Sequence, residues 1–188
     1  MQSENLIQTL VEQTRQLINQ AEKFKSQDLD YLSWRAEANS WNILECLEHL
    51  NLYGDYYLPA MENAIRQSKS KPEPVFKSGV LGNYFAQSML PKEKLNKMNT
   101  FKDKNPLCQE LDKTAIDRFI RQQLKFIELL NQSRKVSLNK VKINTSISTL
   151  IKLKLGDTFQ FIMNHNLRHF VQMERVQAQM KKVVIPVV

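Results

Sequence analysis

Four long stretches of this sequence carry apolar residues at the spacing that places them on one face of an α-helix. They cover residues 6–24, 41–65, 112–132 and 157–176. Residues three and four apart lie on the same helical face, so each stretch presents an apolar stripe that must pack against a partner. No convincing alternation of apolar and polar residues indicates a sheet. The pattern therefore predicts an all-α fold, a bundle of four helices.

Capping residues and proline set the expected boundaries of these helices. Ser40 is the expected N-cap of the second helix, because its hydroxyl can accept a hydrogen bond from a free backbone N–H. Pro59 lies within this helix, and a kink or an early end is expected there. Asp157, with Gln160 three residues later, has the form of a capping box and is expected to begin the fourth helix.

Two long connections, residues 67–111 and 133–156, separate the predicted helices. Proline and glycine punctuate the first, and Val80–Met89 within it has the composition of a short helix. The tract 147–155 is β-branched and partly alternating, a pattern that fits either a helix or a strand. Long connections in a compact domain usually wrap the core or carry function. We therefore expect one domain over residues 1–188, with these two long connections.

The length and composition are those of an ordinary globular domain. The chain has 188 residues, of which 42% are hydrophobic and 24% are charged, and this length suffices for a proper core. Its two cysteines, Cys46 and Cys108, favour a reducing compartment over a disulfide framework. No apolar run approaches the roughly 20 residues that span a bilayer, and the N-terminus lacks a signal-peptide pattern. We expect a cytoplasmic protein without a membrane partner.

The formal net charge of +8 raises the question of a nucleic-acid partner. Lysine and arginine are scattered, however, and there is no sustained basic run, zinc-finger spacing or RNA-binding aromatic motif. A surface with a surplus of solvated lysines explains the charge more simply. We therefore do not expect nucleic acid as a partner.

All three histidines of the chain fall on the apolar stripes of predicted helices. His165 and His169 are four residues apart in the fourth helix, and His49 lies in the second. Imidazoles one turn apart can share a metal ion, and a third from a neighbouring helix would complete the site. Three protein ligands with an open position are typical of catalytic metal sites. The pattern therefore predicts a divalent metal bound by His49, His165 and His169.

Two further residues face the same way as these histidines. Glu45, one turn before His49, is the candidate catalytic residue, as a proton acceptor or occasional fourth ligand; a solvated glutamate on the helix surface is the alternative. Gln172, three residues beyond His169, is a candidate acceptor for an imidazole N–H. The alternative to a metal site is a set of hydrogen-bonded core histidines, which would need partners for both ring nitrogens.

Three segments of the chain, residues 40–50, 97–106 and 155–172, carry a family resemblance. The first contains the pattern Trp-x-x-x-Glu-x-x-x-His and the last contains His-x-x-x-His-x-x-Gln. Together and in this order they resemble the DinB superfamily, in particular its YfiT-like members. Phe101 and Asp103 interrupt the small and basic pattern associated with the middle segment, which bears on the substrate side of the site.

The resemblance implies an antiparallel four-helix bundle with a long crossover, often assembled as a homodimer. It also implies a divalent metal, commonly nickel or zinc, held by His49, His165 and His169. Family members include S-transferases that use a low-molecular-weight thiol such as bacillithiol, a mycothiol-dependent isomerase and metal-dependent hydrolases. The expected function is therefore that of a metal-dependent enzyme, a thiol S-transferase or hydrolase, with a small-molecule substrate. A non-catalytic metal- or ligand-binding bundle and a DNA-associated stress protein are the alternatives.

Overall fold

The computed structural model describes residues 1–91, 100–148 and 150–184. Within them the chain forms the helices α1 (Ser3–Lys25), α2 (Leu29–Ser33), α3 (Ile43–Gln67), α4 (Val80–Met89), α5 (Thr114–Gln132) and α6 (Leu155–Val184), with 3-10 helices at Lys102–Lys104 and Ser133–Lys135. Two short strands, β1 (Lys142–Asn144) and β2 (Lys152–Lys154), pair in an antiparallel hairpin. The predicted all-α class is confirmed, as is the short helix α4. None of the described helices is both long and apolar enough to cross a membrane.

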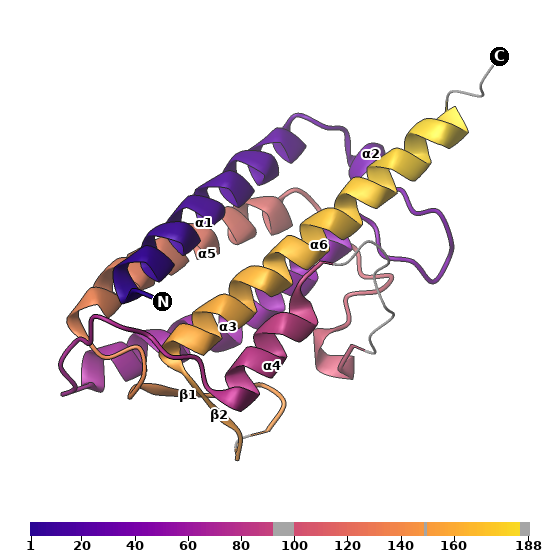
Figure 1. Ribbon diagram of the computed structural model, residues 1–188. Coiled ribbons are helices and arrows are strands. Elements are labelled where there is room, and N and C mark those ends of the chain that lie inside the picture. The colour runs from indigo at the N-terminus through magenta and orange to yellow at the C-terminus, as the bar shows by residue number, and fades with distance from the viewer. Residues whose placement is uncertain (92–99, 149, 185–188) are drawn as a thin grey trace.

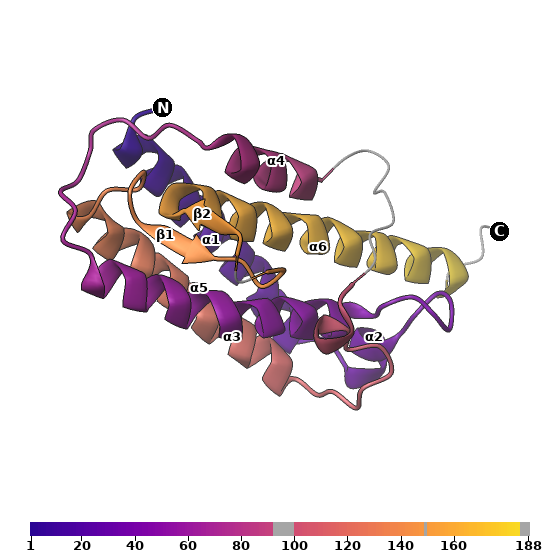
Figure 2. The ribbon, with the colours of Figure 1, turned by 90° about the horizontal axis from the view of Figure 1, so that it is seen from below.

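The long helices α1, α3, α5 and α6 form the bundle (Figure 1). α1 and α5 run in opposite directions, since Glu4 near the start of α1 pairs with Arg134 just beyond the end of α5. α3 and α6 are also antiparallel (Figure 1). α3 and α5 run in the same direction, because Asn51 in the first half of α3 bonds to Ala115 at the start of α5, and Glu62 further along α3 pairs with Lys125 further along α5 (Figure 2). The expected long crossover is therefore present, with α4 lying along α6.

The core lies between the four long helices and contains their apolar stripes. Its large, fully buried side chains include Leu17, Leu44, Phe119, Phe126 and Phe159. The first turns of α3 are enclosed on all sides, since every residue from Ile43 to Asn51 is buried. Polar groups buried in such a stretch require hydrogen-bond partners inside the protein. Glu45 and His49 are two of them.

Asn42, rather than Ser40, caps α3. The Oδ1 atom of Asn42 accepts a hydrogen bond from the backbone N–H of Glu45 at 2.8 Å, and Glu45 Oε2 accepts from the Asn42 N–H at 2.9 Å. These two bonds form a capping box. Ser40 instead donates its hydroxyl to the Glu37 carbonyl in the preceding turn. Serine and asparagine cap helices about equally well, so local sequence did not distinguish two positions so close together.

The expected role of Asp157 as an N-cap is also wrong. α6 begins at Leu155, directly after β2, so Asp157 lies within its first turn. Its buried carboxylate accepts hydrogen bonds from the Ser78 hydroxyl and the Gly79 N–H, at the start of α4. A methyl group at Gly82 would overlap this carboxylate. The glycine thus permits the close approach of α4 to α6, a long-range contact that a local capping pattern does not reveal.

Two other local expectations were resolved by packing. α3 continues through Pro59 and ends at Gln67, so the early end suggested by the proline does not occur. The tract that fitted either a helix or a strand divides, with residues 152–154 forming β2 and α6 following at once. In the hairpin Ile143 pairs with Leu153, and both side chains are buried. The hairpin packs across α3 and α6 (Figure 2).

Candidate metal centre

The three histidines meet between α3 and α6. His49 comes from the second turn of α3, while His165 and His169 lie one turn apart on α6. His165 Nε2 is 3.1 Å from His49 Nε2 and 3.1 Å from His169 Nε2. One nitrogen atom from each side chain lies within 4.8 Å of the other two. Antiparallel packing thus brings together residues that are more than a hundred positions apart in the sequence.

Burial keeps all three imidazoles neutral at physiological pH. Their exposed fractions are 3% for His49, 4% for His165 and 7% for His169. Burial lowers the pKa of His49 to about 4, although its hydrogen bond to the Lys104 carbonyl acts in the opposite direction. The pKa values of His165 and His169 are lowered well below their usual range, chiefly by burial and next by a neighbouring imidazole. Neutral imidazole is the form that ligates metal ions.

Hydrogen bonds at Nδ1 orient two of the three rings. His49 Nδ1 is 2.7 Å from the Lys104 carbonyl oxygen, and His169 Nδ1 is 2.9 Å from Gln172 Oε1. Carbonyl oxygens only accept hydrogen bonds, so each Nδ1 carries the ring proton and donates it. The Nε2 atoms of His49 and His169 are left with lone pairs that face His165 Nε2. Gln172 therefore contacts His169, as its spacing in the sequence had predicted.

The cluster fits a divalent cation because its three converging Nε2 atoms have too few protons to hydrogen-bond to one another. His165 Nε2 can carry at most one proton in a neutral ring, and it faces two lone pairs at 3.1 Å. At least one of these contacts therefore lacks a hydrogen bond of good geometry, at the desolvation cost of buried polar atoms. A cation accepts all three lone pairs and removes the conflict. In tetrahedral zinc sites, bonds of 2.0–2.1 Å place ligand nitrogens roughly 3.3 Å apart, close to the two 3.1 Å separations from His165 Nε2.

Comparison with known proteins identifies the family. A family model described as the DinB superfamily matches residues 10–173, a span that includes all three histidines. The chain belongs to the DinB superfamily. No curated protein and no solved structure gives a significant match. Of the three segments that carried the resemblance, only residues 97–99 lie outside the described part of the chain.

Aromatic rings surround the histidines of this DinB-superfamily protein. The ring centroid of Trp41 is 4.6 Å from that of His49, and the centroid of Tyr53 is 4.5 Å from that of His165. Phe161 stacks on His165 at 6.0 Å. Such rings limit the access of water and strengthen electrostatic interactions inside the site. Burial, with smaller contributions from nearby acidic groups, raises the pKa of Tyr53 to about 12, so its hydroxyl remains protonated.

The segment before α5 supports the centre from outside through groups that sequence patterns did not identify. Lys104 contributes its backbone carbonyl. Every residue has this group, so the sequence could not single it out. Asn105 Oδ1 accepts a hydrogen bond from Trp41 Nε1–H at 3.1 Å. Tyr53 could have been found from the sequence, because it is four residues beyond His49 and shares its helical face.

Glu45 is buried and engaged by contacts within the protein. Its Oε2 atom accepts from the Asn42 N–H, and Oε1 accepts from Arg35 Nη2–H at 2.9 Å and from the Cys108 N–H at 2.6 Å. The alternative of a solvated glutamate is therefore wrong, since none of the side chain is exposed. Among the described residues, the group of ligand atoms around the centre consists of the three histidines alone. The structure does not bring Glu45 into it as a fourth ligand.

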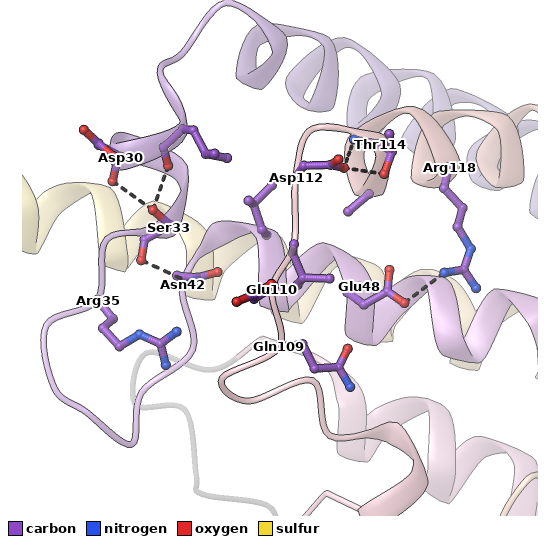
Figure 3. Close-up of a pocket in the computed structure, with 14 residues that line it drawn as sticks. Asp30, Ser33, Arg35, Asn42, Glu48, Gln109, Glu110, Asp112, Thr114 and Arg118 are labelled. Atoms are coloured by element: carbon purple, nitrogen blue, oxygen red, sulfur yellow. Dashed lines mark hydrogen bonds and ion pairs between the residues drawn. The ribbon is translucent and has the colours of Figure 1, made fainter.

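A separate cavity of about 760 Å³ lies on the side of α3 that faces α5 (Figure 3). Its wall combines residues of α2, α3, α5, the α2–α3 connection and the segment before α5, including Arg35, Glu48, Gln109, Glu110 and Arg118. Arg118 pairs with Glu48 at 2.8 Å across one end of the cavity. No histidine lines this cavity. It is therefore distinct from the space around the candidate metal centre.

Proposed function

We propose that this protein binds one divalent cation, nickel or zinc, through His49, His165 and His169, and uses it on a small-molecule substrate. The observation that carries the proposal is the convergence of three buried Nε2 atoms while the Nδ1 protons of two rings are donated elsewhere. Imidazole ligands suit both metals, and selection between them depends on geometry and supply. Family membership and the donor set support the same conclusion.

The protein's own residues prepare the site for this ion. Burial keeps the imidazoles neutral, so metal binding displaces no proton from them at physiological pH. The Lys104 carbonyl and the Gln172 side chain hold two rings in the tautomer that ligates through Nε2. A divalent cation bound there supplies Lewis acidity, which lowers the pKa of a coordinated water or thiol.

Among the family's reactions, we favour transfer of a low-molecular-weight thiol to an electrophile. The thiol loses its proton to solvent, its sulfur forms a bond to an electrophilic carbon, and the leaving group departs with the bonding electron pair. The ligand group contains no carboxylate that could serve as a base for water among the described residues. A free thiol has a pKa near 8.5, far below that of water, and so needs less assistance to ionise.

Elemental analysis of the dialysed protein, followed by activity assays, tests this proposal. We expect about one zinc or nickel ion per chain and thiol-dependent consumption of a fluorogenic electrophile such as monochlorobimane, in proportion to metal content. Protein without stoichiometric metal would contradict the metal site. Metal-dependent ester hydrolysis without thiol transfer would instead identify a hydrolase. Bound metal with no turnover in either assay would identify a non-catalytic binding protein.

The homodimer stays a prediction. Sedimentation of the same sample tests it.

A further inference from the structure

Tyr53 differs from the two other tyrosines of α3 in the state of its hydroxyl. Tyr56 donates its hydroxyl hydrogen to the Thr145 carbonyl at 3.0 Å, and Tyr57 accepts a hydrogen bond from the Ser146 N–H at 3.0 Å. Both are therefore tied to the segment beyond β1. Within the described part of the chain, the Tyr53 hydroxyl has no hydrogen-bond partner, although its ring makes several close contacts. Its polar atom is thus unused by the fold.

The ring of Tyr53 packs directly against two of the proposed ligands. Its centroid is 5.0 Å from that of His49 and 4.5 Å from that of His165, with the planes inclined by 57° and 61°. Tyr53 follows His49 by one helical turn, so both side chains project from the same face of α3. Tyr53 is half-buried, whereas both histidines are buried. The tyrosine therefore packs on the buried imidazoles while part of its own side chain reaches solvent.

The other aromatic donor beside the histidines is already engaged. Trp41 packs on His49, but its indole N–H donates to Asn105 Oδ1 at 3.1 Å. The amide oxygen of Gln172 is likewise engaged by His169 Nδ1. A phenol has an ordinary pKa near 10 and keeps its proton at neutral pH. Tyr53 is thus equipped to donate a hydrogen bond to a molecule that enters the centre.

We propose that the Tyr53 hydroxyl donates a hydrogen bond to an anionic atom of the substrate, a thiolate sulfur or an oxyanion, held at the open side of the three histidines. The inference rests on the proposed function and deepens it by assigning a residue that contacts substrate. Hydrogen bonds to charged acceptors are stronger than neutral ones, particularly where water is scarce. A fixed donor aimed at negative charge favours anionic ligands over neutral ones of the same size.

Azide binding to the cobalt-loaded protein tests this role without an activity assay. Wild type, Tyr53→Phe and Tyr56→Phe are each loaded with Co²⁺, and azide is titrated while the visible absorption of cobalt is followed. Tyr53→Phe keeps the ring that packs on His49 and His165 and removes only the hydroxyl. We expect its azide dissociation constant to rise about tenfold. Its Co²⁺ affinity should remain within about twofold of wild type, because no ligand atom is lost.

Tyr56→Phe is the matched control, since its hydroxyl bonds to Thr145 away from the histidines. It should bind azide as wild type does. Equal azide affinity in wild type and Tyr53→Phe would overturn the role of Tyr53 while leaving the metal site intact, and so would an equal loss in both variants. Cobalt-loaded wild type that binds no azide would also overturn it. Failure of wild type to bind stoichiometric Co²⁺ would overturn the proposed function, and this inference with it.

Discussion

Two buried polar clusters lie one turn apart on α3, and they differ in what completes them. Around Glu45, the Arg35 guanidinium and the N–H groups of Asn42 and Cys108 together satisfy both carboxylate oxygens. Around His49, the outer ring nitrogen has a partner but the inner one faces another imidazole. The first cluster is complete within the protein and serves the fold. In the second cluster the Nε2 lone pairs converge without a cation or enough protons between them. This arrangement indicates that the cluster would bind a cation.

The largest expected effect is on the central histidine. His165 makes both of the 3.1 Å nitrogen contacts, so His165→Ala removes the proposed ligand that joins the other two. Loss of a residue that only supports a ligand costs about 10- to 100-fold in metal affinity, and loss of the ligand itself should exceed about 100-fold. Competition with a chromogenic chelator measures the affinity. If His165→Ala folds and binds metal with wild-type affinity, the histidine cluster is not the metal site, and the contrast between the two clusters is wrong.

Glu45→Gln should affect stability rather than metal binding. The change leaves the partly buried Arg35 without its carboxylate and weakens the capping box with Asn42. We expect a loss of about 2 kcal/mol in the free energy of unfolding, measured by urea denaturation of the metal-free protein. Glu12→Gln, on the exposed face of α1, should change it by less than about 0.5 kcal/mol. If Glu45 were a ligand, Glu45→Gln would instead lower the metal affinity sharply.

Substitution of Gln172 should lower metal affinity by a smaller factor than loss of His165. Gln172→Leu removes the acceptor that orients His169, and an affinity loss of about tenfold is expected. Gln172→Glu retains an acceptor at the same position and should keep affinity near that of wild type. Chelator competition compares the two variants. The same loss in both would show that an acceptor at this position is not enough to support His169.

Asn42→Ala gives the smallest expected effect. The change removes the acceptor for the Glu45 N–H and should cost about 1 kcal/mol of stability. Asn42→Ser keeps a capping oxygen and should recover most of this loss. Both variants should bind metal as wild type does, because they alter only the cluster that is complete within the protein. Thermal unfolding of the metal-free proteins is the measurement, and a change in metal affinity would show that the two clusters are coupled.

Much of the fold followed from local patterns, and the two wrong capping predictions have different causes. The apolar spacing correctly identified the four bundle helices, because a stripe of side chains reports on one helix at a time. The short helix α4 was expected from its composition between proline and glycine residues. Ser40 and Asp157 both had the side chains of caps, but Asn42 caps α3 and Asp157 bonds to Ser78 and Gly79. Ser40 is engaged by a local turn with Glu37, so two local hydrogen-bond patterns competed there, whereas Asp157 is engaged by the long-range packing of α4 against α6.

The sequence by itself determined the helical class and placed His165 and His169 on one face, because both follow from the 3.6-residue period of the helix. It also placed His49 on an apolar stripe. Only the tertiary structure decided that this stripe faces α6 at the level of the other two histidines. It also brought the Lys104 carbonyl to His49 and enclosed Glu45 among donors. Those contacts depend on how the helices align and on the path of the crossover, which long-range packing sets.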